Sequence, residues 1–462
     1  MELKGRNVLV LGLGDTGLSM TRWLVRHGAD VRAADSRDHP PRAAMLADEL
    51  PQVNVATGAF RERDFAGVDM IAISPGIDRR QPPIAEAIGR GVPVVGDIEL
   101  FARALNTEHS TLNAPKVLAV TGSNGKSTVT AMAGDMCLAA GVVTTVAGNI
   151  GLPVLDALAA VENGAVMPGV FVLELSSFQL ESTSSLRPDA AAMLNLCEDH
   201  MDRYDSLANY AAAKARIFAG SGVQVLNRDD AWSVGMARAG RTVATFGLDA
   251  PRSDAEWGIT AARGKRVLAH GARELLAVDE LPVAGLHNAA NALAALALVH
   301  VIDLPEAPLP AALRGFRGLP HRMQRVAEVS GVAFYDDSKG TNVGATVAAL
   351  SGMARPVVLI AGGDGKGQNF APLAAPVTAH ARAVVLIGRD AAALAGALAG
   401  RGVPLTRASS MEEAVRAAFR ASRPGDAVLL SPACASYDMF RNYMHRAEVF
   451  VAAVKALVEC EG

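Results

Sequence analysis

The chain contains 462 residues, of which 50% are hydrophobic and 20% are charged, and its formal net charge at pH 7 is −3. This length exceeds the roughly 250 to 300 residues at which a single hydrophobic core stops growing, so two or three domains are expected. A near-neutral charge with ample apolar residues predicts a soluble globular protein and argues against a nucleic-acid partner.

The apolar segments predict neither export nor a membrane partner. The first run, NVLVLGLG, follows charged residues and is too short for the core of a signal peptide. The longest run, NALAALALVHVI, is interrupted by Asn291 and His300 and falls short of the ~20 residues that a membrane span needs. The four cysteines are scattered with no CxxC pair, which argues against a disulfide framework or a thiolate zinc site. We therefore expect a cytoplasmic protein.

Nine short apolar runs, each ending at glycine or polar residues, predict strands that are buried on both faces of a sheet. They are NVLVLGLG, VDMIAIS, KVLAVTG, VFVLELS, AAAMLNL, VQVLN, PVVLIAGG, AVVLIGR and DAVLLSP. Alanine-rich amphipathic stretches such as 16–28 and 127–141 lie between several of them and end in glycine, as helices commonly do. This alternation predicts parallel α/β sheets.

Two segments divide the chain. The polar residues 106–115 separate two strand-and-glycine-loop units, and the proline- and glycine-rich residues 305–322 precede a new series of α/β units. We interpret both as linkers and expect three α/β domains, at 1–110, 111–318 and 319–462.

The first unit contains GLGDTG from Gly12 to Gly17, after a predicted strand and at the start of a predicted helix, with Asp35 eighteen residues beyond Gly17. This GxGxxG pattern is the dinucleotide fingerprint. The glycines alone establish a tight turn whose backbone N–H groups can meet an anion. A structural turn, an NAD(P) site and a site for another diphosphate-bearing nucleotide all stay open.

The second unit contains TGSNGKST, residues 121–128. Val120 stands where the usual phosphate-loop pattern has its first glycine, but Lys126 and Ser127 are kept. Lysine can reach the β and γ phosphates of ATP, and the hydroxyl can ligate Mg²⁺. The motif predicts a shorter phosphate-binding loop.

Further candidate ligands follow along the chain. Glu174 ends a predicted strand, where ligands bind such sheets and where an unpaired charge would be costly. CEDHMD at 197–202 groups side chains that can bind metals or handle protons, although a solvated loop with a capping aspartate explains them equally well. Lys214, among alanines on a predicted helix, is most simply a solvated side chain. Asn288 and Asn291 share a helix face, where paired amides either hold an adenine edge or cap the helix.

The third unit opens with YDDSKGTN at 335–342 directly after a predicted strand, and GGDGKG at 362–367 follows a later strand. Both loops place a cation beside backbone donors, which suits a carboxylate or a phosphate. Together with Arg322 and Ser436, they predict an anionic second substrate.

The motifs occur in one order along the whole chain: GLGDTG, SPGI, GDIELF, TGSNGKST, GNIG, LELSSFQLE, EDHMDRY, AAKARI, HNAANALAA, GLPHR, DDSKGTNVGAT, GGDGKG and SPACASYDMFRNY. In this the sequence closely resembles the Mur ligases of bacterial cell-wall synthesis, and GLGxTG, SPGI and SPACAS are similar to the family member that adds D-glutamate. The resemblance implies an N-terminal Rossmann-like UDP-binding domain, a central P-loop ATPase-type parallel sheet and a C-terminal Rossmann-like domain.

The resemblance also implies a reaction. A monomeric, ATP-dependent ligase would join D-glutamate to UDP-N-acetylmuramoyl-L-alanine through an acyl phosphate, with two Mg²⁺ ions and a carbamate on Lys214. Domains that carry separate substrates imply closure, with the expected hinge near Gly318. An NAD(P) oxidoreductase would leave Lys126 and Glu174 unexplained, and a non-catalytic nucleotide-binding regulator would release no phosphate.

The family's site residues map onto this chain in groups. The catalytic residues would be Lys126, Asn149, His200 and Lys214. ATP would be bound by Gly122, Ser123, Asn124, Gly125, Lys126, Ser127, Thr128, Asn288, Asn291, Arg322 and Asp337. Metal would be held by Ser127, Glu174, His200 and carbamylated Lys214. D-Glutamate would be bound by Lys339, Thr341, Lys366, Ser436, Tyr437 and Tyr443. The UDP-sugar would be bound by Asp15, Thr16, Asp35, Ser36, Arg37, Ser74, Pro75 and Gly76.

Overall fold

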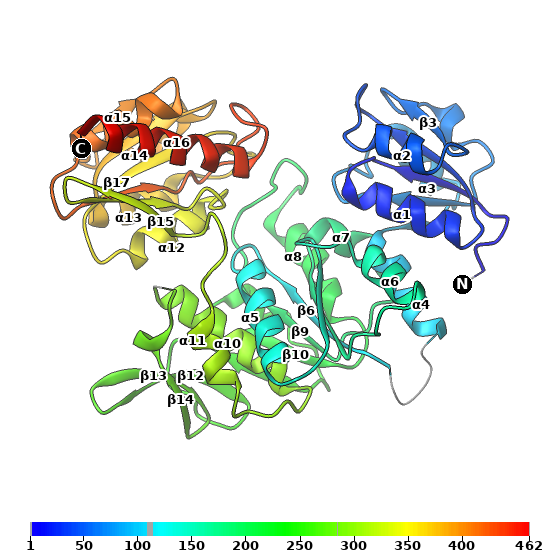
Figure 1. The fold of residues 1–462 in the computed structure, drawn as a ribbon, viewed down its shortest axis with the longest axis horizontal. Coiled ribbons are helices and arrows are strands. Elements are labelled where there is room, and N and C mark those ends of the chain that lie inside the picture. Colours follow the sequence, from blue (N-terminus) through cyan, green and yellow to red (C-terminus); the bar gives the residue numbers. More distant parts are fainter. Residues whose placement is uncertain (1, 109–113, 284, 462) are drawn as a thin grey trace.

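The computed structural model describes residues 2–108, 114–283 and 285–461. Its elements form three lobes, each built on its own sheet (Figure 1). In Figure 1 the N-terminal lobe (blue) and the C-terminal lobe (yellow to red) lie on opposite sides of the view, and both adjoin the central lobe. All nine apolar runs predicted as strands are strands in parallel register with a neighbour, so that prediction is confirmed.

The N-terminal sheet has five parallel strands in the order β3-β2-β1-β4-β5. The chain leaves β1 toward β2 on one side and returns to β4 on the other, so the carboxyl ends of β1 and β4 form a switch point of the kind where ligands bind. The elements are β1 Asn7–Leu11, α1 Asp15–Arg26, β2 Asp30–Asp35, α2 Ala43–Glu49, β3 Asn54–Thr57, β4 Met70–Ile73, α3 Pro82–Gly89, β5 Val94–Val95 and α4 Asp97–Glu108.

The central sheet has nine strands in the order β14-β13-β12-β11-β10-β9-β6-β8-β7. Its strands are β6 Lys116–Thr121, β7 Thr144–Gly148, β8 Val170–Glu174, β9 Ala190–Met193, β10 Val223–Asn227, β11 Val243–Phe246, β12 Glu256–Ala262, β13 Lys265–His270 and β14 Arg273–Ala277. Its helices are α5 Lys126–Ala139, α6 Val154–Glu162, α7 Ser177–Glu181, α8 Leu207–Ala215, α9 Ala231–Val234, α10 Leu286–His300 and α11 Leu309–Gly315.

The C-terminal sheet has six strands in the order β15-β16-β20-β17-β18-β19. Its strands are β15 Gln324–Val329, β16 Val332–Asp336, β17 Val357–Gly362, β18 Ala381–Ile387, β19 Leu405–Arg407 and β20 Ala427–Leu430. Its helices are α12 Val343–Gly352, α13 Ala374–His380, α14 Ala391–Leu398, α15 Met411–Ala421 and α16 Tyr443–Glu461.

The sheets are mostly parallel, as predicted, and the pairings β12–β13, β13–β14 and β15–β16 add antiparallel strands to them. Two of these hairpins turn on a residue pair with positive φ, Arg263–Gly264 (51° and 75°) and Ser330–Gly331 (48° and 79°). Such turns match the twist of paired strands, and their second position suits glycine. The glycine at the second position of each pair was therefore a signal in the sequence for these two hairpins.

The two segments predicted as linkers contain helical residues in the structure. Helix α4 extends to Glu108 inside the first segment, and residues 109–113 lie outside the described residues. The second segment contains α11, which begins at Leu309 with a proline in its first turn, where the missing N–H costs nothing. The proline-rich stretch is thus partly helical.

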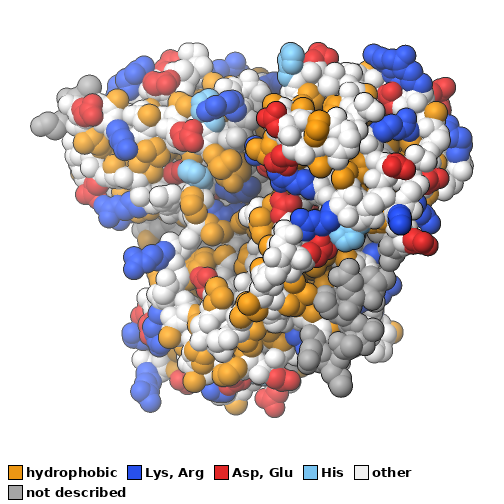
Figure 2. Space-filling model, turned by 45° about the vertical axis from the view of Figure 1, so that its right-hand side comes forward, with side chains coloured by type: hydrophobic (Ala, Val, Ile, Leu, Met, Phe, Trp, Pro, Cys, Tyr) orange, Lys and Arg blue, Asp and Glu red, His pale blue; other side chains and the backbone are white. Residues whose placement is uncertain are grey.

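The lobes are joined in different ways. One continuous cluster of buried apolar side chains runs from the N-terminal sheet through α4 and α6 into the central sheet. The buried clusters of the C-terminal lobe draw their side chains from within residues 329–457 and 343–434, and among the described residues they include no side chain of the other two lobes. On the face shown in Figure 2, positive and negative side chains are intermixed. None of the described helices is long and apolar enough to cross a membrane.

Candidate active site

The phosphate-loop motif connects β6 to α5. Val120 is a fully buried residue of β6, so the turn begins later, at Gly122. Gly125 is the N-cap residue of α5 and has a φ of 83°. A Cβ at Gly125 would lie 2.5 Å from Oδ1 of Asn291, so any larger residue would displace this amide in addition to straining the backbone. The missing glycine reflects a shorter loop.

The ammonium group of Lys126 folds back over this loop. Its Nζ donates hydrogen bonds of 2.8 Å to the carbonyl oxygens of Gly122 and Ser123. Burial lowers the pKa of Lys126, while the charges of Glu174 and Asp199 act in the opposite direction. The cation lies where the backbone N–H groups at the start of α5 can bind an anion.

Glu174 ends β8, and its register partner in β6 is Val120. The side chain is 2% exposed, its Oε1 accepts a hydrogen bond of 2.8 Å from Nδ2 of Asn149, and its buried Oε2 has no hydrogen-bond partner among the described residues. An unpaired buried carboxylate oxygen is costly, and a bound cation would remove that cost. A Cβ at Gly148 would lie 2.4 Å from the Glu174 carbonyl oxygen, so glycine lets Asn149 approach.

The side-chain oxygens beside the phosphate loop suit Mg²⁺ better than a metal ion whose ligands all come from the protein. Glu174 and Ser127 offer a carboxylate and a hydroxyl, which are hard oxygen ligands. In residues 2–108, 114–283 and 285–461, no group of three or more His, Cys, Asp or Glu side chains is placed to hold a metal ion. Mg²⁺ commonly takes its remaining ligands from water and substrate phosphates.

Lys214 is buried, so its interpretation as a solvated side chain is wrong. It is 1% exposed, its Nζ donates a hydrogen bond of 2.8 Å to the Gly122 carbonyl oxygen, and it lies 4.6 Å from the ring centroid of Tyr210. Burial, reinforced by the charge of Lys126, holds the pKa of Lys214 well below its usual range. The environment therefore favours the neutral amine, which is the nucleophilic form.

His200 lies beside Lys214 with a φ of 59°. Burial lowers the pKa of His200 to about 4, and the charge of Asp199 only partly offsets this. A neutral imidazole is the form that binds a metal.

The C-terminal lobe contributes cations to the same place. Arg322 donates a hydrogen bond of 2.9 Å to Oγ of Ser127. Nζ of Lys339 lies 3.9 Å from the ring centroid of Tyr443, and burial lowers the pKa of Lys339 to about 8. These cations arrive from a lobe with a separate core, so the complete site forms only where two lobes meet.

Lys366 forms an ion pair with Asp199 across the same junction. Although burial raises the pKa of Asp199, the charges of Lys366 and His200 outweigh it and lower that pKa to about 2. The carboxylate is therefore ionised, and the pair links the loop at 362–367 to the loop at 197–202.

One positioning side chain was missed by sequence reasoning. Arg446 on α16 is fully buried and donates hydrogen bonds to Oγ and O of Ser338 and to the carbonyl oxygen of Cys434, at 2.7 to 3.0 Å. It ties together the loops that carry Lys339 and Ser436. An arginine on an amphipathic helix gives no sequence signal of such a role.

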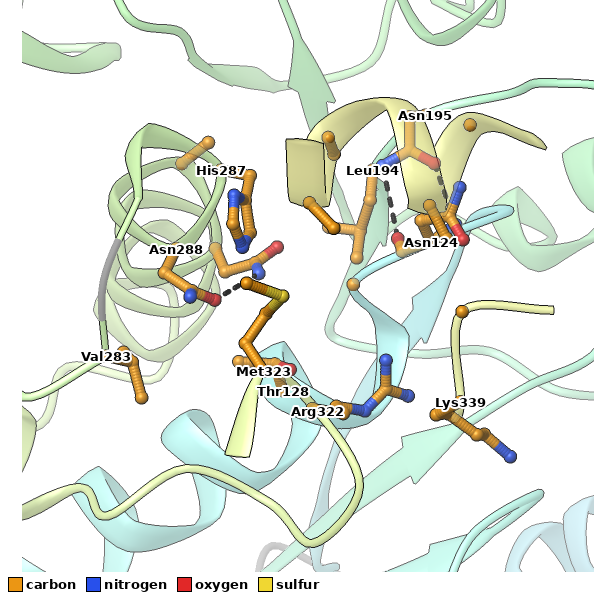
Figure 3. A pocket seen from close by; sticks show the side chains of 18 of the residues that line it. Asn124, Thr128, Leu194, Asn195, Val283, His287, Asn288, Arg322, Met323 and Lys339 are labelled. Atoms are coloured by element: carbon orange, nitrogen blue, oxygen red, sulfur yellow. Dashed lines mark hydrogen bonds between the residues drawn. The ribbon is translucent and has the colours of Figure 1, made fainter. Parts of the chain in front are cut away.

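Two neighbouring cavities open at the junction of the central and C-terminal lobes. The first has a volume of about 390 Å³ and the second about 350 Å³, and both are lined by Asn124, Gly125, Arg322 and Lys339. Figure 3 shows the first cavity, with Arg322 and Lys339 on one side and His287 and Asn288 on the other.

The first cavity has an apolar wall and a polar edge. Leu194, Phe246 and Phe316 contribute apolar surface. Asn291 donates a hydrogen bond of 3.2 Å to Oδ1 of Asn288, and both amides line the cavity. Such a cavity suits a flat base with hydrogen-bonding edges.

Asp337 also lines the first cavity. Burial raises the pKa of Asp337 to about 7, although a hydrogen bond from Ser431 and the charge of Arg322 act against this. A carboxyl group with this pKa is partly ionised near neutral pH, and its ionised form can accept hydrogen bonds from a ligand.

The second cavity gathers most of the remaining predicted residues. It is lined by Ser123, Lys126, Ser127, Asn149, Glu174, His200, Lys214, Thr341, Lys366, Ser436, Tyr437 and Tyr443. Of the predicted catalytic, ATP, metal and D-glutamate residues, Gly122 alone lines neither cavity. Tyr210 and Asn342 also line the second cavity and were not predicted, although both lie inside quoted motifs or directly beside them.

The N-terminal glycine loop is built differently. A Cβ at Gly17 would lie 1.7 Å from the Gly12 carbonyl oxygen, which explains the last glycine of the motif. Ser74 donates a hydrogen bond of 2.9 Å to the same oxygen. Asp35 is fully buried and accepts hydrogen bonds from the Leu13 amide (2.6 Å) and from Arg37 (2.5 to 2.9 Å). The carboxylate is therefore used inside the protein and holds the loop in shape.

The other residues predicted to bind the UDP-sugar come from three loops of the N-terminal lobe and line neither cavity. Ser36, Arg37 and Gly76 are exposed, Thr16 and Pro75 are half-buried, and Asp15 is exposed and paired with Arg42.

Three family models match the chain: "Mur ligase MurD-like, N-terminal domain" at residues 6–96, "Mur ligase middle domain" at 120–299 and "Mur ligase, glutamate ligase domain" at 321–434. A UDP-N-acetylmuramoylalanine--D-glutamate ligase of Thiobacillus denitrificans is 60% identical and covers 99% of this chain and 98% of its own. A protein of the same name from Methylobacillus flagellatus is 58% identical over 100% and 99% of the two chains.

Solved structures share the fold at low identity. UDP-N-acetylmuramate-alanine ligase from Thermotoga maritima has a TM-score of 0.59 at 19% identity and covers 98% of this chain and 99% of its own. MurF from Acinetobacter baumannii has a TM-score of 0.61 at 17% identity and covers 99% and 91%.

Proposed function

This chain belongs to the Mur ligase family, and we propose that it joins D-glutamate to UDP-N-acetylmuramoyl-L-alanine while ATP is converted to ADP and phosphate. The observation that supports this most strongly is the second cavity. There a phosphate-loop lysine, a buried carboxylate with an unpaired oxygen and a buried lysine meet two lysines from another lobe.

The reaction must activate a carboxylate, which is a poor electrophile. We propose that a carboxylate oxygen of the UDP-linked substrate attacks the γ-phosphorus of ATP and that ADP leaves. The amine of D-glutamate then attacks the acyl carbon, an amide bond forms, and phosphate leaves with the carboxylate oxygen that attacked. Holding both reactants in one cavity replaces a bimolecular encounter by a positioned one.

Lys126 would stabilise the charge that develops on the transferring phosphoryl group, together with the N–H groups at the start of α5. Asn288 and Asn291 would hold the adenine edge, and Asp337 would accept from the ribose. Asn149 would orient Glu174 and face the phosphates. Closure of the two lobes would exclude water from the acyl phosphate.

Ser127 and Glu174 would hold one Mg²⁺, and His200 with carbamylated Lys214 would hold a second. The ions would supply neutralisation of phosphate charge. The buried, neutral-favouring environment of Lys214 supports the carbamate, because the neutral amine is the form that reacts with carbon dioxide.

D-Glutamate has two carboxylates, and Lys339 and Lys366 provide two cations in the second cavity. Thr341, Ser436, Tyr437 and Tyr443 complete the proposed amino-acid site. Since Lys366 pairs with Asp199, a substrate carboxylate would compete with Asp199 for this lysine.

The UDP-sugar would lie at the N-terminal switch point. Thr16, Ser36, Arg37, Pro75 and Gly76 would contact it, while Asp15, Asp35 and Ser74 shape the loops around it. Because the reaction consumes ATP and a UDP-linked precursor, we place it in the cytoplasm, with the enzyme acting as a monomer.

Phosphate release tests the proposal. Purified protein with UDP-N-acetylmuramoyl-L-alanine and ATP receives either D-glutamate or L-glutamate. Release with the D isomer alone is expected, and equal turnover with L-glutamate would contradict the assigned specificity.

A further inference from the structure

Two asparagine side chains bridge the phosphate loop and the C-terminal lobe. Nδ2 of Asn124 donates to Oδ1 of Asn342 at 3.1 Å, and Nδ2 of Asn342 donates back to Oδ1 of Asn124 at 3.0 Å. The two residues are 218 positions apart in the chain. This reciprocal amide pair joins the loop at 121–128 to the loop at 335–342.

Asn342 has a full set of hydrogen bonds. Besides the pair with Asn124, its Nδ2 donates to Oδ2 of Asp199 at 3.1 Å, and its Oδ1 accepts from the Ala345 amide at 2.9 Å as the N-cap of α12. Both amide hydrogens and the oxygen are used, and the residue is 2% exposed. Only a primary amide supplies this combination of donors and acceptors, so asparagine does here what serine or aspartate cannot.

Asn124 is clamped on its other side by its own lobe. Its backbone N–H donates to Oδ1 of Asn195 at 2.8 Å, and its carbonyl oxygen accepts from Nδ2 of Asn195 at 3.1 Å. A shift of the C-terminal loop is therefore passed to the backbone that leads into Gly125 and Lys126.

The same asparagine adjoins the proposed amino-acid site. Lys339 and Thr341 precede Asn342 in one short loop and line the second cavity with it. Asp199 accepts from Asn342 on Oδ2 and pairs with Lys366 on Oδ1. An amino-acid carboxylate bound by Lys366 would release one oxygen of Asp199 and leave the carboxylate to Asn342.

We propose that Asn342 is a positioning residue that couples occupation of the amino-acid site to the geometry of the phosphate loop. The inference rests on the proposed function, since it takes the two sites to bind an amino acid and ATP. We expect D-glutamate to tighten the binding of ATP, and thermodynamic linkage then requires that ATP tightens the binding of D-glutamate by the same factor.

The test measures that factor by calorimetry in the full chain. A non-hydrolysable ATP analogue is titrated at saturating UDP-N-acetylmuramoyl-L-alanine, with and without D-glutamate. The wild-type protein should bind the analogue about five-fold or more tightly when D-glutamate is present. In Asn342→Ser, which keeps an N-cap for α12 but cannot reach Asn124, the difference should fall below about two-fold.

Asn124→Ala removes the same bridge from the opposite side without touching a helix cap, and it serves if Asn342→Ser fails to fold. If the bridge is the coupling element, the double variant loses no more coupling than either single variant, because both remove one interaction. Glu198→Ala is the matched control, since Glu198 accepts from the Asn369 amide (2.9 Å) across the same junction and no hydrogen bond joins its side chain to the phosphate loop among the described residues. Its coupling should equal that of the wild-type protein.

Phosphate release by the wild-type protein separates the two claims. Normal release with coupling retained in Asn342→Ser and Asn124→Ala overturns the inference alone. Equal loss of coupling in Glu198→Ala also overturns it, because the effect would then belong to the junction as a whole. Absence of phosphate release with D-glutamate contradicts the proposed function and the inference with it.

Discussion

Two glycine loops of this protein look alike in sequence and differ in what surrounds them. Residues 12–17 and 121–128 both follow a buried parallel strand and open a helix. The backbone of the first loop is hydrogen-bonded to the side chains of Asp35 and Ser74 from its own lobe. The second is met by Glu174 and Lys214 of its own lobe and by Arg322 of another.

We interpret the difference as a division of roles, in which each glycine loop offers backbone donors to an anion and the neighbouring side chains determine the chemistry at that anion. The N-terminal loop has backbone donors beside Arg37, whose guanidinium is paired with Asp35, and we propose that it only binds a diphosphate. The central loop adds a cation, a hydroxyl and an unpaired buried carboxylate oxygen, which suit phosphoryl transfer.

The largest expected effect comes from removing the lysine of the central loop. Lys126→Met should lower kcat for phosphate release by roughly a thousand-fold, because the charge on the transferring phosphoryl group loses its main protein partner. Stopped-flow or steady-state phosphate assays measure this.

The matched change in the N-terminal loop is Thr16→Ala. It should raise KM for the UDP-linked substrate several-fold and leave kcat unchanged, since only binding is affected. If Thr16→Ala lowers kcat as much as Lys126→Met does, the two loops do not divide binding from chemistry.

The next largest effect concerns Lys214. Lys214→Ala should lower turnover by roughly a hundred-fold or more, with partial recovery when acetate or another small carboxylate is added, because the lost group is proposed to act as a carboxylate. Recovery with a small amine instead of a carboxylate would show that Lys214 acts as a cation. Unchanged turnover would remove Lys214 from the site.

Asp35 should affect stability more than catalysis. Asp35→Asn should lower the free energy of unfolding by about 2 kcal/mol at neutral pH, because charge-assisted hydrogen bonds to Arg37 and Leu13 are lost. Despite burial, those bonds hold the pKa of Asp35 below its ordinary value of 3.8. A carboxyl group with a lowered folded-state pKa stabilises the protein above its unfolded-state pKa, and the stabilisation is lost as the pH falls through the folded-state value.

Urea unfolding at neutral and acidic pH checks this. The difference between wild type and Asp35→Asn should shrink as the pH falls below 3.8. A difference that is the same at both pH values would show that the effect does not come from ionisation.

The smallest effect is a pH dependence in the first cavity. The pKa of Asp337 is about 7, so its carboxyl group ionises as the pH rises through this value. The ionised form is the better acceptor for a ribose hydroxyl, so KM for ATP should fall a few-fold between about pH 6 and about pH 8. Asp337→Asn should remove that part of the pH dependence, and an unaltered profile in this variant would assign it to ATP itself.

The sequence predicted the strands well and the burial of charged side chains poorly. The strands were identified because short runs such as KVLAVTG are apolar at successive positions, which is typical of a strand buried on both faces of a sheet. Lys214 was misjudged because the alanines around it carry no sign of the Tyr210 ring and the Gly122 carbonyl oxygen that enclose it. Arg446 was missed for the same reason, since its partners lie 12 and 108 positions away.

The proposed roles of the site residues came from the family resemblance. The structure added that these residues line two neighbouring cavities. Spacing alone left open whether Asn288 and Asn291 cap a helix or hold an adenine edge, and the structure adds that both line the first cavity. Contacts between lobes, such as Asn124 with Asn342, depend on how separate sheets meet and have no local signal.

The central claim is that the γ-phosphoryl group of ATP goes to the carboxylate of the UDP-linked substrate. UDP-N-acetylmuramoyl-L-alanine labelled with oxygen-18 in its carboxylate tests this by mass spectrometry of the released phosphate. The account predicts one labelled oxygen in each phosphate, because the attacking carboxylate oxygen leaves with it. Phosphate without label would contradict the acyl phosphate and show that the phosphoryl group was transferred to another acceptor.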